Sequence, residues 1–310
     1  MNVAIIGAGI AGLRCGQLLK EGGVRVSIFD KGRFVGGRLS TRTRSGHFDH
    51  GAQYVTARAP TFVAQMERWL AKGIAARWKF RHLDLATGAV TAKERTLGSE
   101  RARRLAEALA AELPIELETE VAPLDGHTLR DTGGKALGTF DSIVVTAPTV
   151  QTRRLLAAYP SLLAPLAPIE HAPCWALMVD FETPWTIDAD VLAHGNAIAW
   201  AAREASKPGR PKTNGWIVHA SPEWSRANLE LDREQAAVAL FDELRTLGEL
   251  PPLTHQKAHR WRYAQVVRAA EIPCVVGEGI AIAGDGLLGP RVEAAWLSGE
   301  AAAQRLLEAR

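Results

Sequence analysis

The spacing of hydrophobic and polar positions changes several times along this chain, and each change predicts an element. Residues 2–7 form a short apolar run, which a glycine-rich turn and a segment of helical period follow. A second apolar run, 24–30, comes after the glycine pair that ends this segment. Because the order is strand, helix, strand, the pattern predicts a βαβ unit.

The following part of the chain carries signals of the same two kinds. Residues 61–72 gather apolar side chains on one side, as an amphipathic helix does. Ser99 is a plausible N-cap for a second helix over 100–113. Apolar runs near 115–121 and 140–148 predict two more strands.

A different texture begins near residue 150, where apolar and polar positions alternate. Alternation of this kind predicts antiparallel strands with one covered face. Four runs show it: 174–182, 197–204, 215–221 and 258–266. A helix is expected over 233–247 and a loop over 206–215. Six of the nine tryptophans lie in this part: Trp175, Trp185, Trp200, Trp216, Trp224 and Trp261.

After Pro273 the chain returns to its first pattern, with a strand over 279–285 and a final helix from Arg291. We therefore expect an α/β fold in which an antiparallel-sheet domain is inserted into a Rossmann-type domain. Two packed domains are the default at 310 residues. The Rossmann-type domain would comprise residues 1–60, 95–150 and 265–310. The inserted, substrate-binding domain would comprise residues 61–94 and 151–264.

Composition excludes several classes of protein. The formal net charge of +3 is small, so neither a nucleic-acid-binding stripe nor a polybasic membrane patch is expected. Three widely spaced cysteines without a CxxC pair exclude a dithiol redox centre, a zinc ribbon and a dense disulfide framework. We find no signal-peptide pattern and no run of about 18 apolar residues. The expectation is a cytoplasmic protein without a metal, a nucleic-acid partner or a membrane partner.

The turn GAGIAG, residues 7–12, matches G-x-G-x-x-G between a strand and a helix. Gly7 makes the tight turn, Gly9 lets a pyrophosphate approach the backbone, and Gly12 permits close packing of helix on strand. Amide groups at the start of the helix face the anion. Asp30 ends the second strand, where its carboxylate would accept bonds from both ribose hydroxyls. Together these features predict a dinucleotide site.

Two further segments favour FAD over NAD. Residues 36–38, GGR, add a second close approach of backbone and a guanidinium that can neutralise a diphosphate. In AIAGDGLLGPRVEAAW (281–296), Asp285 is expected at the end of a strand, where it can accept bonds from the ribityl chain of FAD. The helix that starts near Val292 would aim its positive end at the flavin edge that becomes anionic on reduction. Since a nicotinamide cofactor has no ribityl group, the sequence predicts FAD.

GAGIAG, FDK, GGR and FDHGAQY, with the terminal GDGLLGPRVEAAWLSGEAAAQRLL, resemble the FAD-dependent amine-oxidase superfamily. Within it, the chain resembles the bacterial renalase-like oxidoreductases from end to end. Four segments carry this narrower resemblance: FDHGAQYVTAR (48–58), GWIVHASPEWSRANL (215–229), HRWRYA (259–264) and GPRVEAAWLSG (289–299). Relatives usually carry a Pro-Gly-Met turn where this chain has RTLGSERARRL (95–105). This departure bears on the substrate and not on FAD.

The resemblance implies a two-domain flavoprotein fold like that of p-hydroxybenzoate hydroxylase. It also implies a FAD-dependent oxidase that moves hydride from a 2- or 6-dihydro isomer of NAD(P) to flavin N5, with reoxidation by O2 giving NAD(P)+ and H2O2. A dihydropyridine becomes an aromatic pyridinium, so no general base is required. The residues expected at the non-covalent FAD are Gly7, Gly9, Ala11, Gly12, Asp30, Lys31, Gly37, Arg38, Ala52, Gln53, Val121, Asp285, Arg291 and Val292.

The substrate pocket is expected where the inserted strands cover the flavin. Its candidates are Tyr54, Trp216, His219 and Trp261, with Tyr263 beside them. Aromatic rings stack on a nicotinamide or an amine cation, and core packing is the alternative for any single tryptophan. Arg262 alternates with Trp261 and is expected to face away from it. His47 and His50 flank Asp49, and we interpret this group as a hydrogen-bonded turn that holds the flavin rather than as a catalytic base.

Two other functions stay open. A flavin amine oxidase would need an aromatic cage, which the aromatic residues of this chain can supply. A non-catalytic flavin-binding redox protein would have the same cofactor residues. A flavin monooxygenase is less favoured, because no second Gly-containing D-G motif lies in mid-chain. The positions of Cys15 and Cys274 argue against covalent attachment of the flavin.

Overall fold

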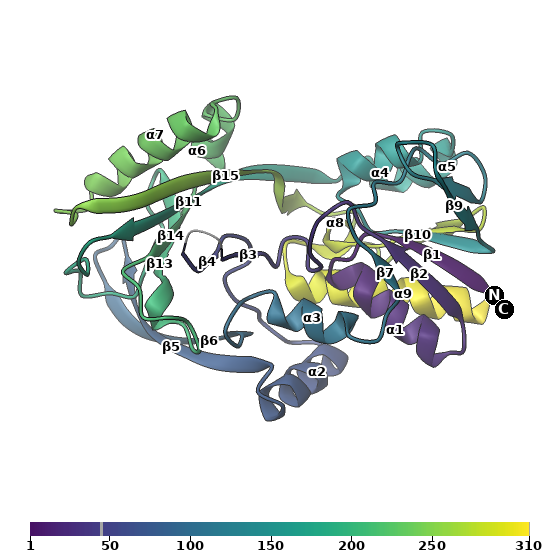
Figure 1. The fold of residues 1–310 in the computed structure, drawn as a ribbon, viewed down its shortest axis with the longest axis horizontal. Coiled ribbons are helices and arrows are strands. Elements are labelled where there is room, and N and C mark those ends of the chain that lie inside the picture. The colour runs from purple at the N-terminus through teal and green to yellow at the C-terminus, as the bar shows by residue number, and fades with distance from the viewer. Residues whose placement is uncertain (44–45, 310) are drawn as a thin grey trace.

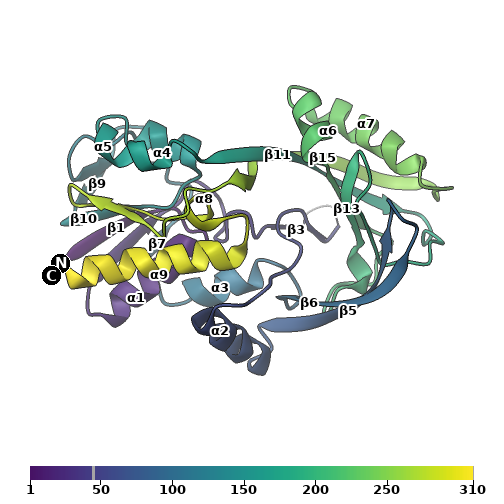
Figure 2. The same ribbon diagram turned by 180° about the vertical axis from the view of Figure 1, so that it is seen from behind.

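Two large β-sheets lie toward opposite ends of the molecule, and two long strands and several loops join them (Figure 1). The computed structural model describes residues 1–43 and 46–309. The two chain ends lie together beside the smaller sheet (Figures 1 and 2). Within the described residues, we find no helix that is long and apolar enough to cross a bilayer.

The smaller sheet has six strands. From edge to edge they are β16 (Val275–Gly277), β17 (Ile280–Ile282), β10 (Ser142–Val145), β1 (Asn2–Ile6), β2 (Arg25–Phe29) and β7 (Ile115–Glu116). Neighbours are parallel, except that β16 is antiparallel to β17. Val3 and Ile5 of β1 enter one hydrophobic core, and Ala4 and Ile6 enter another. Both faces are covered, which explains the unbroken apolar run in the sequence.

Helices cover both faces of this sheet (Figure 2). Those on the Val3 side are α1 (Ile10–Glu21), α2 (Pro60–Ala71), α3 (Arg104–Ala110) and α9 (Val292–Glu308). On the Ala4 side lie α4 (Thr149–Leu155), α5 (Pro160–Leu163) and the small hairpin β8 (Thr128–Arg130) and β9 (Ala136–Thr139).

The first and last helices cross closely. A Cβ on Gly299 of α9 would lie 3.0 Å from the backbone of Ala11 in α1 and would overlap its carbonyl oxygen. Next to this contact, Arg14 pairs with Glu300, and its guanidinium lies 4.2 Å from the ring centre of Trp296. The last helix is therefore fixed to the helix that follows the glycine turn.

The larger sheet has seven strands. Their order is β15 (Leu253–Arg268), β11 (Glu170–Phe181), β14 (Trp216–Ala220), β13 (Ile198–Arg203), β12 (Val191–Ala193), β5 (Ala75–Asp84) and β6 (Val90–Gly98). Neighbours are antiparallel, except that β12 is parallel to β5. The long strands β11 and β15 extend toward the six-stranded sheet (Figure 1).

The two faces of the larger sheet have different neighbours. Helices α6 (Pro222–Ala227) and α7 (Arg233–Arg245) cover the outer face, where Trp175 and Leu240 lie in one core. The inner face carries Trp78 and Met178, and it packs on Phe48. Phe48 belongs to β4 (Phe48–Asp49), which pairs with β3 (Thr41–Arg42) between the two sheets (Figure 1).

Three expected elements need correction. The hairpin of β5 and β6 was not expected, although Trp78 and Phe80 alternate there with charged residues. Ser99 does not cap a helix, because α3 begins only at Arg104 and the Ser99 amide donates to the Ile74 carbonyl at 2.8 Å. The strand expected over 115–121 is reduced to β7. The serine that caps a helix is Ser221, whose side chain accepts the Trp224 amide at 3.2 Å at the start of α6.

The domain boundaries remain a prediction. The hairpin of β5 and β6 belongs to the seven-stranded sheet, to which β11 to β15 also contribute. Helix α2 was expected in the inserted domain. Its Phe62 and Trp69 instead pack with Trp296 in the core of the six-stranded sheet.

Candidate cofactor and substrate site

The glycine turn between β1 and α1 is closed at two points and open at a third. Gly7 has φ 114°, and its amide donates to the Phe29 carbonyl at 2.8 Å. A Cβ on Gly12 would overlap the Gly7 carbonyl oxygen. A Cβ on Gly9 would meet nothing within 4 Å. The free side of Gly9 is therefore where a phosphate group can reach the backbone at the start of α1.

The second glycine pair lies against this turn. The Gly36 amide donates to the Ala8 carbonyl at 2.8 Å, and a Cβ on Gly37 would lie 3.7 Å from the Cα of Gly9. The Asp30 carboxylate accepts a hydrogen bond from the Ala8 amide at 2.6 Å. The end of β2, the glycine turn and the second glycine pair thus form one continuous backbone surface.

The predicted FAD residues near the end of β2 differ in how accessible they are to a ligand. Asp30 also accepts the Gly32 amide at 2.6 Å, which holds its carboxylate at the rim of the glycine turn. Lys31 lies 3.7 Å from Glu120 on the surface. Val121 is buried in the hydrophobic core. Asp30 is the member of this group that is placed to meet a ligand.

Arg38 joins the first and last parts of the chain. Its guanidinium lies 2.5 and 2.7 Å from the two oxygens of Asp285 and donates to the Ala264 carbonyl at 3.1 Å. The sequence predicted Asp285 at the end of a strand. In the structure, Asp285 is instead the first residue of the short helix α8 (Asp285–Leu288), which follows β17. Helix α9 begins at Val292, and Arg291 is its N-cap residue.

Residues 50–52 form a turn that rests on the segment after Arg38. The His50 amide donates to the Ser40 carbonyl at 3.1 Å, and the Ala52 amide donates to the Arg38 carbonyl at 2.9 Å. A side chain at Gly51 would overlap the Arg38 carbonyl oxygen. The turn is therefore held at a fixed distance from the Arg38–Asp285 pair.

The Gln53 side chain is fully engaged within the protein. Its NH2 group donates to the carbonyl oxygens of Asp49 and Gly51, and its Oε1 accepts from Lys207 Nζ at 3.0 Å. Gln53 can therefore offer its backbone, and not its amide group, to a cofactor.

A charge cluster with almost no exposed surface lies behind this turn; it consists of Asp49, Glu204, Lys207 and Arg210. Arg210 lies 2.5 Å from Asp49, and Lys207 lies 2.8 Å from Glu204 and 3.7 Å from Asp49. Burial by itself would raise the pKa of Asp49, but Lys207 and Arg210 outweigh it and lower the pKa to about 2. Burial raises the pKa of Glu204 to about 7, against the attraction of Lys207.

Sequence reasoning missed the two cations of this cluster, because it treated 206–215 as a loop and gave its residues no role. The segment is irregular, yet Lys207 and Arg210 are buried. The available signal was the pair of prolines, Pro208 and Pro211, which restrict the backbone beside the two cations.

Asp49 also accepts the Thr41 hydroxyl at 2.6 Å and the Ala102 amide at 2.9 Å. In the described part of the chain, its hydrogen-bond partners do not include His47 or His50. This arrangement fits a hydrogen-bonded turn rather than a catalytic base.

Three imidazoles and an indole meet where the turn touches the seven-stranded sheet: His50, His219, His259 and Trp261. Trp261 donates to the His50 carbonyl at 2.8 Å and stacks on the His50 ring at 5.4 Å. Burial lowers the pKa of His50 and of His219 to about 4, and the pKa of His259 to about 3. These imidazoles are therefore neutral at pH 7. Among the described residues, no group of His, Cys, Asp and Glu is arranged to hold a metal ion.

His219 belongs to a row of residues across the inner face. It pairs with Trp200 of β13 and with Ala176 of β11, and Ala176 pairs with His259 of β15. The Tyr54 ring lies 5.5 Å from the Trp200 ring. The row therefore faces Tyr54, which follows the turn of residues 50–52.

Trp216 does not lie with His219 and Tyr54, although the sequence analysis proposed it for the substrate pocket. It stands three positions before His219 in β14, and an odd separation directs it to the opposite face of the sheet. There it is fully buried, 5.0 Å from the Trp185 ring, in the core under α7. Core packing was the correct reading for this tryptophan.

The neighbouring residues of β15 point in different directions. Arg262 pairs with Glu230 at 2.9 Å on the exposed side, which confirms that it faces away from Trp261. The Tyr263 ring lies 6.2 Å from the His171 ring.

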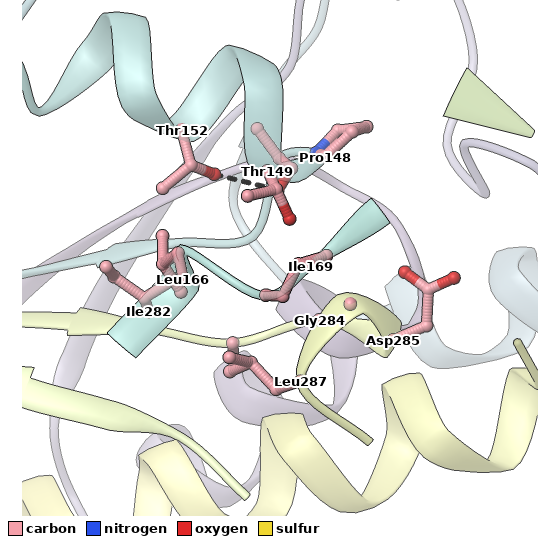
Figure 3. Close-up of a pocket in the computed structure, with 12 residues that line it drawn as sticks. Pro148, Thr149, Thr152, Leu166, Ile169, Ile282, Gly284, Asp285 and Leu287 are labelled. Atoms are coloured by element: carbon pink, nitrogen blue, oxygen red, sulfur yellow. Dashed lines mark hydrogen bonds between the residues drawn. The ribbon is translucent and has the colours of Figure 1, made fainter. Parts of the chain in front are cut away.

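A small pocket lies between the start of α4 and α8 (Figure 3). Its volume is about 10 Å³, which is the space of one water molecule. Ile169, Ile282 and Leu287 line it, and Figure 3 shows the Asp285 carboxylate turned away from these apolar groups. The pocket is too small for a cofactor and adjoins the candidate site through Asp285.

The residues present fit a flavin dinucleotide. The backbone at Gly9 is open, and the side chains of Arg38 and Asp285 are 30% and 11% exposed beside it. A cation suits a diphosphate, and a carboxylate suits hydroxyl groups.

Comparison with known proteins supports this fold. Residues 5–68 match the family described as an NAD(P)-binding Rossmann-like domain. The chain is similar to a protein from Exiguobacterium sp. 255-15 that is named as a protoporphyrinogen oxidase, with a TM-score of 0.75 and 14% identity. It is also similar to two variants of a putrescine oxidase with redesigned cofactor binding, with TM-scores of 0.73 and 0.71 and 13% identity. Each of these similarities covers 100% of this chain and 99% of the other. The chain therefore has, over its full length, the mixed α/β fold with a Rossmann-type domain that these oxidases share.

Proposed function

We propose that this protein is a FAD-dependent oxidase whose substrate is a dihydronicotinamide. One observation carries the cofactor assignment: Gly9, Gly37, Arg38 and Asp285, from both ends of the chain, lie on one surface. The fold shared with proteins named as oxidases supports the reaction class.

Each part of this surface has a proposed role. The Gly9 backbone and Arg38 would take the diphosphate, and Asp285 would accept hydroxyl groups of the ribityl chain. The start of α9 at Val292 would direct its positive end toward the flavin. When bound, FAD supplies the acceptor for hydride at N5 and returns the electrons to O2 as H2O2.

The side chains around Tyr54 suit a neutral dihydropyridine. Oxidation of a 2- or 6-dihydro isomer of NAD(P) gives an aromatic pyridinium, so no residue has to remove a proton. His50, His219 and His259 carry no charge at pH 7, because burial lowers their pKa. Trp261 and Tyr54 offer rings on which a pyridine ring can stack.

Anaerobic stopped-flow absorbance tests this proposal. FAD-bound protein is mixed with borohydride-reduced NAD+, which contains several dihydro isomers. We expect fast bleaching by the non-standard isomers and slow or no bleaching by ordinary NADH. Admission of O2 should restore the yellow colour and give H2O2. Protein that refuses FAD, or that no dihydro isomer bleaches, would contradict the proposal.

Non-covalent binding of FAD is a separate part of the proposal. Cys15 is buried in α1, and burial raises its pKa to about 12, which leaves the thiol unreactive. Precipitation with trichloroacetic acid should leave the yellow colour in the supernatant, whereas colour in the pellet would show a covalent link.

A flavin amine oxidase is the second candidate. The Tyr54 and Trp200 rings form an aromatic pair, and the similarity to putrescine oxidase adds support. Fast anaerobic bleaching by putrescine, without bleaching by dihydro isomers, would favour this candidate. A non-catalytic flavin-binding protein would turn over neither substrate.

The proposed partners are a small-molecule substrate and O2. We also propose a cytoplasmic location, which the three free cysteines support, since unpaired thiols are typical of a reducing compartment.

A further inference from the structure

Two cations on β6 point toward the candidate substrate site. Lys93 and Arg95 pair with Phe80 and Trp78, and residues directly opposite in an antiparallel pair share a face. Phe80 and Trp78 are buried on the inner face. Lys93 and Arg95 therefore stand on the inner face too, at the edge of the sheet.

A short bridge fixes the position of Arg95 relative to the turn. The Val55 amide donates to the Thr96 carbonyl at 2.7 Å. This bond holds Tyr54 beside Arg95, whose guanidinium lies 5.3 Å from the centre of the Tyr54 ring. The Trp200 indole N–H, next to Tyr54, is buried and has no hydrogen-bond partner in the described structure.

The outward cations of the same hairpin are paired, and the inward ones are not. Arg77 and Lys79 lie 3.1 and 3.9 Å from Glu94 on the outer side. Within the described part of the chain, Lys93 and Arg95 have no carboxylate within 4.0 Å, and Arg95 donates to the Glu94 carbonyl at 2.9 Å. Hence the cations of this hairpin that lack a carboxylate partner lie on its inner face, and Arg95 lies against the Tyr54 ring.

The surroundings of His82 show the same accumulation of charge. After burial, Lys93 and His194 are the main causes that lower the pKa of His82, and Arg95 adds to them. The nearby carboxylate, Asp84, is hydrogen-bonded to His194 at 2.7 Å. Two partly exposed cations without a carboxylate partner, Lys93 and Arg95, and the unpartnered indole N–H of Trp200 therefore lie on the face that holds Tyr54.

We propose that Lys93 and Arg95 bind the phosphate groups of the substrate and make the enzyme selective for a dihydronicotinamide dinucleotide over an uncharged dihydronicotinamide. Arg binds phosphate through a planar fork of N–H donors, and Lys binds it as a point charge. The pyridine ring would then lie on the Tyr54 side. The identity of the substrate rests on the function proposed above.

Equilibrium binding tests this inference without turnover. ADP-ribose, which has the diphosphate but no reducible ring, is titrated calorimetrically into FAD-bound protein, so that the cofactor site is already filled. The double variant Lys93→Met/Arg95→Met should bind it at least about tenfold more weakly, since it loses the hydrogen bonds of two charged groups to the diphosphate. Arg95→Lys should lie between the two, and added salt should weaken wild-type binding more than that of the double variant.

The matched control is Arg77→Met/Lys79→Met, which removes the same charge from the outer face, where these side chains are 64% and 83% exposed. It should bind ADP-ribose like the wild type. Equal binding by the wild type and the inner-face variant, or no binding by the wild type, would overturn the inference. Thermal unfolding of all variants checks that they fold.

Reduction kinetics separate this inference from the proposed function. Dihydro isomers of 1-methylnicotinamide carry no phosphate and should bleach the wild type and the inner-face variant equally. The dinucleotide isomers should show a raised half-saturating concentration in the variant with an unchanged limiting rate. If no dihydropyridine bleaches the flavin, the proposed function fails, whereas the ADP-ribose titration still decides the role of Lys93 and Arg95.

Discussion

At the scale of residues, the charge cluster fixes the turn before any ligand binds, and Asp49 is its centre. Replacing Asp49 by Asn leaves Arg210 buried without its counter-charge and removes one of the two carboxylates beside Lys207. We expect the free energy of unfolding to fall by about 3–5 kcal/mol, as is typical when one partner of a buried pair is removed. Urea unfolding measures it. Asp188→Asn, which breaks an exposed pair with Arg81, should cost under about 1 kcal/mol; equal losses would disprove the role of burial.

Glu204 should give the stability a specific dependence on pH. Its pKa is raised by burial to about 7, from 4.5, so the folded state holds more protons than the unfolded state between these values. The contribution of Glu204 to stability is therefore largest at low pH and decreases as pH rises from about 4.5 to 7, by at most about 1.4 kcal/mol per pH unit.

Glu204→Gln removes this titration and keeps the shape. The difference in unfolding free energy, wild type minus variant, should become smaller as pH rises from 5 to 7 and level off above. Taking the difference cancels the buried histidines, which titrate in both proteins and lower stability on acidification. A difference that does not change with pH would show that Glu204 is charged throughout.

Some site residues could be read from the sequence because their chemistry depends on close neighbours. Gly7, Gly9 and Gly12 are spaced within one turn, and each has the environment that its role requires. Trp216 could not be placed, because a strand has two faces and the sequence does not say which one is covered. The contact of Lys207 with Asp49 could not be predicted, because the two residues are far apart in the sequence.

At the scale of elements, the crossing of α1 and α9 depends on the absence of a side chain at Gly299. Alanine would favour an isolated helix by about 1 kcal/mol. Here the added Cβ would overlap the Ala11 carbonyl, so we expect Gly299→Ala to lower the unfolding midpoint and weaken FAD binding. Thermal unfolding and flavin retention test this. Gln304→Ala on the exposed side of α9 should leave both unchanged, and a stabilised Gly299→Ala would refute the close crossing.

The elements themselves were predicted best where the run was apolar throughout or the helical period was long. The apolar run of β1 is covered on both faces, and the helical period of α7 continues over 13 residues. The β5–β6 hairpin was missed, because its outer positions carry charges and β6 is an edge strand with few buried residues. The end of the strand before Asp285 was misplaced, because the sequence did not reveal the short helix α8.

At the scale of the whole molecule, the fold closes both ends of the chain on one surface. The parallel order of β10, β1 and β2 places the glycine turn and the segment after β17 at the same edge of the sheet. The order of the segments along the chain and the glycine pattern were sufficient to predict that these two segments lie together. At this edge, Arg38 from the first part of the chain contacts Asp285 from the last part. We therefore expect the two residues to bind FAD as a unit.

Arg38→Gln and Asp285→Asn test this coupling through the affinity of the apoprotein for FAD, measured by quenching of flavin fluorescence. Each single variant should bind FAD at least about tenfold more weakly, because it removes one group and leaves its partner charge unpaired. The double variant should lose less than the product of the two single effects, since neither charge then remains alone. Arg25→Gln, on the exposed start of β2, should bind FAD like the wild type. Independent, multiplicative losses would show that the two ends of the chain bind separate parts of the cofactor without supporting each other.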